Sequence, residues 1–522
     1  MKKIYLFLYL FLCTSILSFS QNSNKDSANK KATPPKDRNM FGLHIPRGLK
    51  INTPGIAEGY IIFAVPNSPY VYLLNRRGEV VHEWKGAYGA FNAYLQNDGS
   101  IILGEFDPDF PTFGFGGPYG RLQKISWDNK ILWNFELAND TEIIHHDFNV
   151  MPNGHILAIA YEAKSYDQAI AMGRKPEKTP KDGPWLEKII EIVPEGKKGG
   201  KIVWEWHLKD HLIQDFDSKK SNYGKPAEHP ELLDMNMGPK LPPAISQDSV
   251  ETLQAKGMEG PNATAGNLGA DIFHFNAIKY NADLDQIAFS SPNLSEIFII
   301  DHSTTTQQAA THKGGRWGKG GDFLYRWGNP KNYQRGDSTN EQLFGQHDVR
   351  WIPKGYPGES DLTVYNNDIP YMSDSMNYSM IFEIKPPTDS KGNYYLEANK
   401  TFGPEKPVWT YMSPDTISFH GSFISGAERL KSGNTFINEG PKARFFEVTP
   451  DGKIVWEYLN PYRGNITETN GDPTPLMPMT YFAFRANFIA ADHPGLANKK
   501  LEPIVPQPSP FILPPPPMNG NH

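Results

Sequence analysis

The sequence predicts an all-β fold, a six-bladed β-propeller of four-stranded antiparallel blades with long loop insertions. A strand that carries a tryptophan near its end recurs six times, as in "ILWNF", "IVWEW", "PVWTY" and "IVWEY". In four of these units the next apolar strand opens on a histidine. Because each blade of a propeller buries its faces only against its neighbours, a repeat of one such unit is typical of this architecture. The recurring tryptophans, which we expect to pack in the core, are Trp84, Trp133, Trp206, Trp327, Trp409 and Trp456.

Turn dipeptides separate the apolar runs inside these units. An Asn-Gly or Asp-Gly pair supplies the positive φ angles that a two-residue hairpin needs, so each such pair predicts a tight turn between antiparallel strands. The Asn-Gly and Asp-Gly pairs are Asp98-Gly99, Asn153-Gly154 and Asp451-Gly452, and a further turn is expected at Arg77-Gly78.

The composition agrees with many short strands and excludes one class of partner. The 522 residues include 46 glycines and 45 prolines, and 12% of the chain is aromatic. This length exceeds what one ordinary core supports, but a propeller grows by adding blades around an axis and so holds it in one domain. The formal net charge of −6 offers no basic field. We therefore expect no nucleic-acid partner.

The N-terminus is typical of an exported protein. Two lysines precede the apolar run "IYLFLYLFLCTSILSF", and small or polar residues follow it. This pattern predicts a signal peptide over residues 1–20 with cleavage near Ser20. No second apolar span follows that would hold the chain in a membrane, so we expect a periplasmic or secreted protein. Cys13 is the only cysteine, and its loss with the signal would leave no disulfide. Lipoprotein cleavage at Cys13 is a disfavoured alternative, because the residues before it are bulky.

The rest of the chain divides by composition. A polar linker is expected at 21–54, the propeller at 55–490 and a Pro-rich tail at 491–522. Two long segments interrupt the strand rhythm inside the propeller, at 162–187 and 207–270. Loops of this length in a compact domain are usually lids or binding loops, or else disordered.

Four histidines stand at matching places in four successive units, and they carry the functional signal. They are His146, His274, His347 and His420, each near the start of the strand that follows a tryptophan strand. The innermost strands of a propeller line a central channel, so equivalent positions far apart in sequence converge there. A residue needed only for packing would occur in all six units, but the first and last units lack it. His145, beside His146, is ambiguous, because alternation lets only one of the two face the channel.

The other histidines of the repeat region lie on turns or insertions and are expected to contact solvent. They are His155, His207, His211, His229, His302 and His312.

Several chemistries lack their sequence patterns. No G-x-S-x-G motif supports a serine hydrolase, and the glycines of "GKGG" at 318–321 follow no pattern of a phosphate-binding loop. Converging histidines could hold a metal, but no acidic residue accompanies them at helical metal spacing, and no metal site is predicted. A histidine acting as nucleophile, acid and anion binder remains.

Three stretches now identify a resemblance. "DIFHFNAIKYNADLDQIAFSSPNLSEIFIIDHST", "GQHDVRWIP" before "VYNND", and "FHGSFISGAERLKSGNTFI" before "VWEY" are similar to the bacterial aryl-sulfate sulfotransferase family. The resemblance covers roughly residues 55–490. Members of that family are exported six-bladed propellers that move a sulfuryl group from a phenol sulfate to another phenol, without a nucleotide donor.

The resemblance implies roles for particular residues. His420 matches the family's nucleophile and would carry a transient sulfohistidine in a ping-pong reaction. His274 and His347 match the residues that hold the sulfuryl oxygens and handle the phenol proton. His146 and Asn276 are further candidates for binding substrate. An aryl sulfate donor and a phenolic acceptor would be the small-molecule partners, and no cofactor is expected.

The chain lacks an arginine where the family has one in its site. The family's site arginine follows an Asn-rich strand end, where this sequence reads "VYNNDIPYMSDSMNYSM" without an arginine. Arg444 is the best candidate for a compensating cation and Arg350 the next, while Asn366 and Asn367 would supply only polar contacts. The chain also lacks room before residue 55 for the family's separate N-terminal β-domain, and it lacks the disulfide that some members have.

Two other functions therefore stay open at this point. One is a catalytically altered or non-catalytic propeller that serves as a binding module. The other is a propeller whose histidines hold a metal and that acts on a sulfated carbohydrate. The sequence predicts neither the donor nor the acceptor, nor the oligomeric state.

Overall fold

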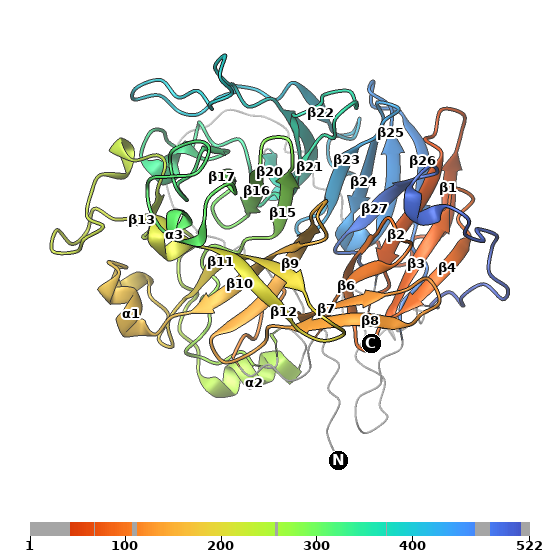
Figure 1. Cartoon of the computed structure of the whole chain (residues 1–522), viewed down its shortest axis with the longest axis horizontal. Coiled ribbons are helices and arrows are strands. Elements are labelled where there is room, and N and C mark those ends of the chain that lie inside the picture. The colour runs from red at the N-terminus through yellow and green to blue at the C-terminus, as the bar shows by residue number, and fades with distance from the viewer. Residues whose placement is uncertain are drawn as a thin grey trace, which may run out of the picture.

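A computed structural model describes residues 42–66, 68–106, 112–255, 259–260, 262–371, 373–464 and 481–512. Six sheets of four or five antiparallel strands follow one another around a common centre, and a further sheet has two strands. Figure 1 shows the sheets in chain order, with the blue C-terminal strands beside the red N-terminal ones. The predicted six-bladed propeller is confirmed.

The blades are numbered along the chain, and the innermost strand of each is named first. Blade 1 has β27 (Ala486–Ala490), β2 (Gly59–Ala64), β3 (Tyr70–Asn75) and β4 (Val80–Lys85). Blade 2 has β5 (Ala90–Leu95), β6 (Ile101–Phe106), β7 (Gly120–Ile125) and β8 (Ile131–Glu136). Blade 3 has β9 (Glu142–Val150), β10 (Ile156–Ala163), β11 (Trp185–Pro194) and β12 (Gly200–His207).

The second half of the ring repeats this order. Blade 4 has β15 (Ala277–Asn281), β16 (Gln286–Ser291), β17 (Glu296–Asp301) and β18 (Tyr325–Trp327). Blade 5 has β19 (His347–Trp351), β20 (Leu362–Tyr371), β21 (Ser373–Ile384) and β22 (Trp409–Tyr411). Blade 6 has β23 (Gly426–Arg429), β24 (Thr435–Glu439), β25 (Arg444–Val448), β26 (Ile454–Leu459) and the outermost β1 (Gly48–Asn52).

Both ends of the described chain close the ring. The C-terminal β27 pairs with β2 and becomes the innermost strand of blade 1, and the N-terminal β1 adds a fifth strand to blade 6. The linker expected at 21–54 is therefore wrong over β1, which pairs with β26 despite its polar surroundings. The Pro-rich tail packs on blade 1 and blade 6, where Ile504 N donates to Val80 O and Phe511 N donates to Pro461 O. The expected signal peptide and Cys13 lie outside the described residues.

The insertions hold the short helices. The segment expected as an insertion at 162–187 contains α1 (Tyr166–Ala171) and η1 (Pro176–Lys178), but its two ends extend β10 and β11. The segment at 207–270 carries η2 (Leu208–His211), η3 (Pro226–Glu228), α2 (Gln247–Ala255) and the parallel pair β13 (Leu212–Ile213) and β14 (Leu233–Asp234). Elsewhere lie α3 (Thr306–Ala309), η4 (Pro330–Tyr333), η5 (Gly440–Lys442) and η6 (Pro494–Leu496). In the described part of the chain, no helix is both long and apolar enough to cross a membrane.

The recurring tryptophans lock each blade to the next. Five of them sit on the fourth strand of a blade, counted from the channel, and donate their indole N–H to a backbone oxygen in the loop before the fourth strand of the following blade. The pairs, from blade 2 to blade 6, are Trp133 to Gly199, Trp206 to Gly321, Trp327 to Pro404, Trp409 to Pro450 and Trp456 to Arg76. A buried indole needs such an acceptor, so this contact explains why the residue repeats. All six tryptophans are buried except Trp409, which is half-buried, so the expectation of a core position is only partly met there.

Replacing one of these tryptophans with alanine should destabilise the propeller, and the loss should be larger where the indole is more deeply buried. We expect Trp456→Ala to lower the free energy of unfolding by about 3–5 kcal/mol, because it empties a fully buried site and removes the hydrogen bond to Arg76. Trp409→Ala is the matched control, since it loses the same kind of bond from a half-buried ring. Urea unfolding of both variants measures the difference. An equal loss in the two would contradict the account.

Candidate active site

Two of the predicted histidines lie in contact across the channel. The rings of His146 and His274 are 4.3 Å apart between centroids and meet edge to face at 73°. Both residues have left-handed backbones, with φ of 52° and 53°. Non-glycine residues rarely adopt this conformation, and they persist in it where the surrounding structure imposes it, often at functional sites. Strand β9 accommodates His146 with a bulge opposite β10, which turns the side chain out of strict alternation.

Asn367 ties the other two histidines together. Its side-chain oxygen lies 3.0 Å from Nδ1 of His347, and its Nδ2 donates to the backbone oxygens of Gly421 and Ile424 at 2.6 and 3.1 Å. Gly421 follows His420 directly. A single amide on β20 therefore holds the ring that opens β19 and the loop that leads into β23.

The partners of His347 fix its tautomer. Nδ1 faces two oxygens that can only accept a hydrogen bond, those of Gly345 and Asn367, each at 3.0 Å. The orientation of the Asn367 amide is itself set by the two carbonyls to which it donates. Nδ1 must carry the proton, so Nε2 presents its lone pair. Nε2 is buried and has no hydrogen-bond partner among the described residues.

His420 is oriented in the opposite sense. Its Nε2 lies 2.7 Å from Oδ1 of Asp368, and its backbone N–H donates to Glu439. A carboxylate accepts the Nε2 proton, so the lone pair is on Nδ1. Nδ1 is buried and likewise unpartnered within the described chain. This is the arrangement of an activated nucleophile, in which a third group orients the imidazole.

A second carboxylate orients His274. Its Nδ1 contacts Oδ2 of Asp271, which also accepts a hydrogen bond of 2.8 Å from the hydroxyl of Tyr161. The Asp271 carboxylate thus orients this imidazole through Nδ1. His274 and His420 are each 6% exposed, whereas His146 is fully buried. His146 is therefore the most enclosed of the three imidazoles.

His145 belongs to the wall behind the site. Its Nε2 lies 2.9 Å from Glu187, its Nδ1 lies 2.7 Å from Nδ1 of His146, and its ring stacks on Tyr161 at 3.6 Å. It is fully buried, so the ambiguity in the sequence resolves in favour of His146 as the residue nearer to His274.

Three of the buried histidines, His145, His146 and His347, have lowered pKa values. Burial, followed by the neighbouring His274, lowers the pKa of His145 and of His146 well below the ordinary value. Burial and then the positive charge of Arg485 lower the pKa of His347 in the same way. These imidazoles are neutral near pH 7, in the form that can accept a proton or attack an electrophile.

Arg485 is the cation at the centre of the site, and sequence reasoning missed it. Its Nη1 donates to Ser425 O at 2.7 Å, its Nη2 donates to Asn276 O at 2.9 Å, and its Nε lies 3.2 Å from Oδ1 of Asp348. It is 1% exposed. The residue stands in "YFAFRANFI", one of the two units without a histidine, just before the innermost strand β27. Arg485 thus occupies the place that a histidine has in four of the other units, and this correspondence is visible in the sequence.

The two arginines proposed from sequence as compensating cations are each held by carboxylates. Arg444 pairs with Glu439 at 3.0 Å and Glu457 at 2.5 Å, on β24 and β26 of its own blade. Arg350 pairs with Asp348 at 2.7 Å and with Glu428 at 3.3 Å. Both guanidiniums are held by carboxylates of the blade and of the channel floor, because a partly buried charge finds the nearest opposite one.

Asn276 and Asn366, two of the candidate asparagines, use their side-chain amides in hydrogen bonds within the protein. Asn276 Nδ2 donates to Gln346 O at 3.0 Å, and its side-chain oxygen accepts a hydrogen bond from Ser290. Asn366 accepts from Phe344 N at 2.7 Å and donates to Gln342 O at 2.8 Å. They shape the segment leading to His347.

An ionic layer forms the floor beneath the histidines. Asp348, next to His347, contacts Arg485 on one side and Arg350 on the other. Asp147, next to His146, holds Lys279 at 2.8 Å. Burial alone would raise the pKa of Asp147, but Lys279 and then Arg485 keep it below the usual value. The layer fills the channel with paired charges.

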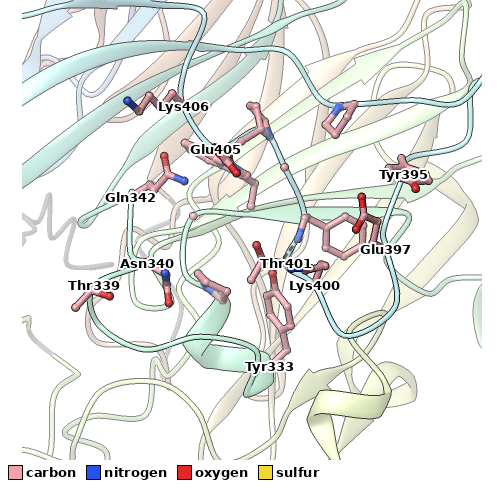
Figure 2. Close-up of a pocket in the computed structure, with 17 residues that line it drawn as sticks. Tyr333, Thr339, Asn340, Gln342, Tyr395, Glu397, Lys400, Thr401, Glu405 and Lys406 are labelled. Carbon is pink, nitrogen blue, oxygen red and sulfur yellow. Dashed lines mark hydrogen bonds between the residues drawn. The ribbon is translucent and has the colours of Figure 1, made fainter.

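Two cavities lie away from the histidines. One of about 710 Å³, at the far ends of β15, β19, β23 and β27, is lined by Lys279 and Arg350 from the ionic layer. Figure 2 shows the other, of about 900 Å³, between Tyr333, the segment 339–342 and the loop that bears Lys406. The catalytic candidates are identified from side-chain geometry.

The channel histidines do not form a metal centre within the described chain. The one group of three histidine or carboxylate ligands whose atoms converge there is His211, His312 and Asp322, at the periphery of blade 4. His211, which we expected to contact solvent, is fully buried, because the aromatic ring of Trp206 stacks on it at 5.3 Å.

The low pKa of His347 should appear in the pH dependence of stability. The unfolded chain takes up this proton below about pH 6.5 and the folded chain does not, so falling pH favours unfolding. Relative to His347→Gln, which keeps a donor toward Asn367, the wild type should lose up to about 1.4 kcal/mol per pH unit below about pH 6.5. Urea unfolding from about pH 8 to about pH 5 measures the difference. Parallel profiles for the two proteins would refute this assignment.

Comparison with known proteins identifies the family. The family model described as Arylsulfotransferase (ASST) matches residues 55–472. No curated protein matches the chain.

Solved structures are similar to this chain only at low identity and low TM-score. A protein of unknown function from Bacteroides caccae is 11% identical, with a TM-score of 0.39, over 77% of this chain and 94% of that chain. Virginiamycin B lyase from Staphylococcus aureus is 11% identical, with a TM-score of 0.33, over 81% of this chain and 90% of that chain. Likenesses at this level carry no argument about function.

Proposed function

This chain belongs to the arylsulfotransferase family, and on that premise we propose that it transfers a sulfuryl group from an aryl sulfate to a phenol through a sulfohistidine on His420. The observation that carries the proposal is the Asp368–His420 pair. It leaves the Nδ1 lone pair of His420 buried and unpartnered among the described residues, in a loop that Asn367 ties to the ring of His347. No nucleotide donor enters this scheme.

The first half-reaction forms one N–S bond and breaks one S–O bond. Nδ1 of His420 attacks sulfur, and the electron pair of the S–O bond leaves on the phenolate oxygen. That oxygen takes a proton from Nε2 of His274, whose imidazolium is stabilised by Asp271 through Nδ1. The sulfated ring of His420 keeps its other proton on Nε2, so it is cationic, and the carboxylate of Asp368 balances that charge.

The second half-reaction returns every group to its start. An acceptor phenol gives its proton to Nε2 of His274, and its oxygen attacks sulfur. The N–S bond breaks, and its electron pair returns to Nδ1 of His420. Sulfuryl transfer resembles phosphoryl transfer in that positioning and charge stabilisation do most of the work. His274 serves as acid and then as base, as microscopic reversibility requires for a reaction whose substrate and product are both aryl sulfates.

In this scheme His347 and the positive charge of Arg485 stabilise the negative charge on the sulfuryl oxygens. His347 is neutral while the site is empty, because burial and Arg485 disfavour its proton. An anion in the channel reverses this preference, so Nε2 can gain a proton and donate to a sulfuryl oxygen. Arg485 is bound to backbone oxygens and acts as a fixed positive charge in a water-poor site, where such charges are strongest.

Replacement of His420 tests the covalent step. His420→Ala, incubated with a nitrophenyl sulfate in the absence of a phenol, should form no sulfated enzyme and release no burst of nitrophenol. The wild type should gain the mass of one SO3 on the peptide that contains residue 420. His155→Ala is the matched control, because His155 lies on the β9–β10 turn and pairs with Glu191 outside the site.

Asp368→Asn gives a graded test in the same assay. An amide cannot accept the Nε2 proton through its NH2 end or balance a cationic sulfohistidine, so sulfation should slow by between ~10² and ~10⁴ while the label stays on His420. A wild-type protein that binds aryl sulfate and never becomes labelled would instead support the binding-module function. Normal labelling in His420→Ala would remove His420 from the reaction.

A further inference from the structure

Two histidines and an aspartate converge at the outer side of blade 4, where His211 meets His312 and Asp322 from a loop about a hundred residues later in the sequence. One ligand atom from each of His211, His312 and Asp322 lies within 4.8 Å of the others. His211 ends η2 at the root of the insertion at 207–270, and the other two lie in the loop between β17 and β18. Figure 1 shows α3 of that loop beside β13 of the insertion. We propose that these three residues bind a divalent transition-metal ion, and that the ion is zinc.

The contacts of His211 suit a metal ligand. Its Nε2 lies 2.7 Å from the backbone oxygen of Ala309, which can only accept, so Nε2 carries a proton. Its Nδ1 then faces Oδ1 of Asp322 at 2.8 Å. A neutral imidazole would oppose its lone pair to the carboxylate, so either a second proton or a metal ion must stand between the two atoms. A backbone carbonyl that accepts the outer ring proton is the usual orienting partner of a metal-bound histidine.

A second imidazole aims at the same oxygen. Nδ1 of His312 also lies 2.8 Å from Oδ1 of Asp322, so two ring nitrogens approach one carboxylate atom. Imidazole and carboxylate are ligands that suit zinc, which three protein groups and a water can hold in tetrahedral geometry. Zinc bonds of about 2.0–2.1 Å would place ligand atoms about 3.3 Å apart, so each contact needs to open by only about 0.5 Å.

The two inner ligands are held in place and the outer one is free to close the site. The ring of Trp206 lies parallel to that of His211, and its indole N–H donates to Gly321, the residue before Asp322. A side chain at Gly321 would collide with the His211 ring. By contrast, 59% of the His312 side chain is exposed. The buried pair is thus preformed, and His312 can move to complete the coordination from solvent.

A metal at this place would fasten the insertion to blade 4. The chain enters the insertion at His211 and leaves it just before Asp271, which orients His274. Zinc would therefore fix one end of a segment whose other end supports the proposed acid–base residue. The site takes no part in sulfuryl transfer, so its failure and that of the proposed reaction are separable.

Zinc titration of the metal-stripped full chain tests the proposal. Calorimetry should show one zinc ion bound per chain, with a rise of the melting temperature on binding. His312→Ala should weaken binding by about 100-fold or more and abolish that rise, because it removes a ligand. Its own metal-free melting temperature should stay close to that of the wild type, since the side chain is exposed. Asp322→Asn should weaken binding as well.

Two control variants guard against zinc bound elsewhere. His229→Ala removes an exposed histidine of the same insertion, which pairs with Glu231, and should bind zinc as the wild type does. His420→Ala should do the same, which excludes the channel histidines as the zinc ligands. Absence of zinc binding in the wild type would overturn the proposal and leave a protonated His211 paired with Asp322. Equal affinity in the wild type and His312→Ala would overturn it too.

Discussion

The centre of the propeller depends on the buried guanidinium of Arg485. It stands just before the strand that closes the ring and touches three other blades, through Ser425 O, Asn276 O and Asp348. Removing such a group from water costs several kcal/mol unless hydrogen bonds and an opposite charge offset it. Closure of the ring satisfies these conditions, because only then do the four segments meet. The same charge lowers the pKa of His347 and makes the channel favourable to an anion.

The histidines occupy similar places in their blades, but their hydrogen-bond partners differ. Asp368 accepts the proton of Nε2 in His420, Asp271 contacts Nδ1 of His274, and amide and peptide oxygens take the Nδ1 proton of His347. The partners differ, so each ring presents a different atom to the channel. A repeat architecture thus supplies one position per blade, and residues outside the repeat assign its chemistry.

The fold could be predicted from the sequence because its cause is repeated. Each outer-strand tryptophan from blade 2 onward bonds the next blade, so the residue recurs wherever the contact does. The convergence of His146 with His274 followed from the same logic. Strand β1 could not be recognised in this way, because its residues are mostly exposed and its pairing with β26 spans almost the whole chain.

The residues that hydrogen-bond the histidines could not be predicted from the sequence. Nothing in the sequence distinguishes Asp368, within β20, or Asp271, before β15, until the fold places them against His420 and His274. Arg444 was a reasonable cation by chain position, but Glu439 and Glu457 hold it. Arg485 does not belong to the histidine pattern, because the closing blade has an arginine at the matching position.

A crystal structure with a bound aryl sulfonate tests the central claim most directly. The sulfur of this analogue is bonded to carbon, and that bond does not break, so the group cannot be transferred. The ligand should therefore remain intact where the donor binds. The account predicts the sulfonate group among His274, His347 and His420, with sulfur in line with Nδ1 of His420. A sulfonate in the cavity beside Tyr333 and Lys406, with the channel histidines untouched, would contradict it.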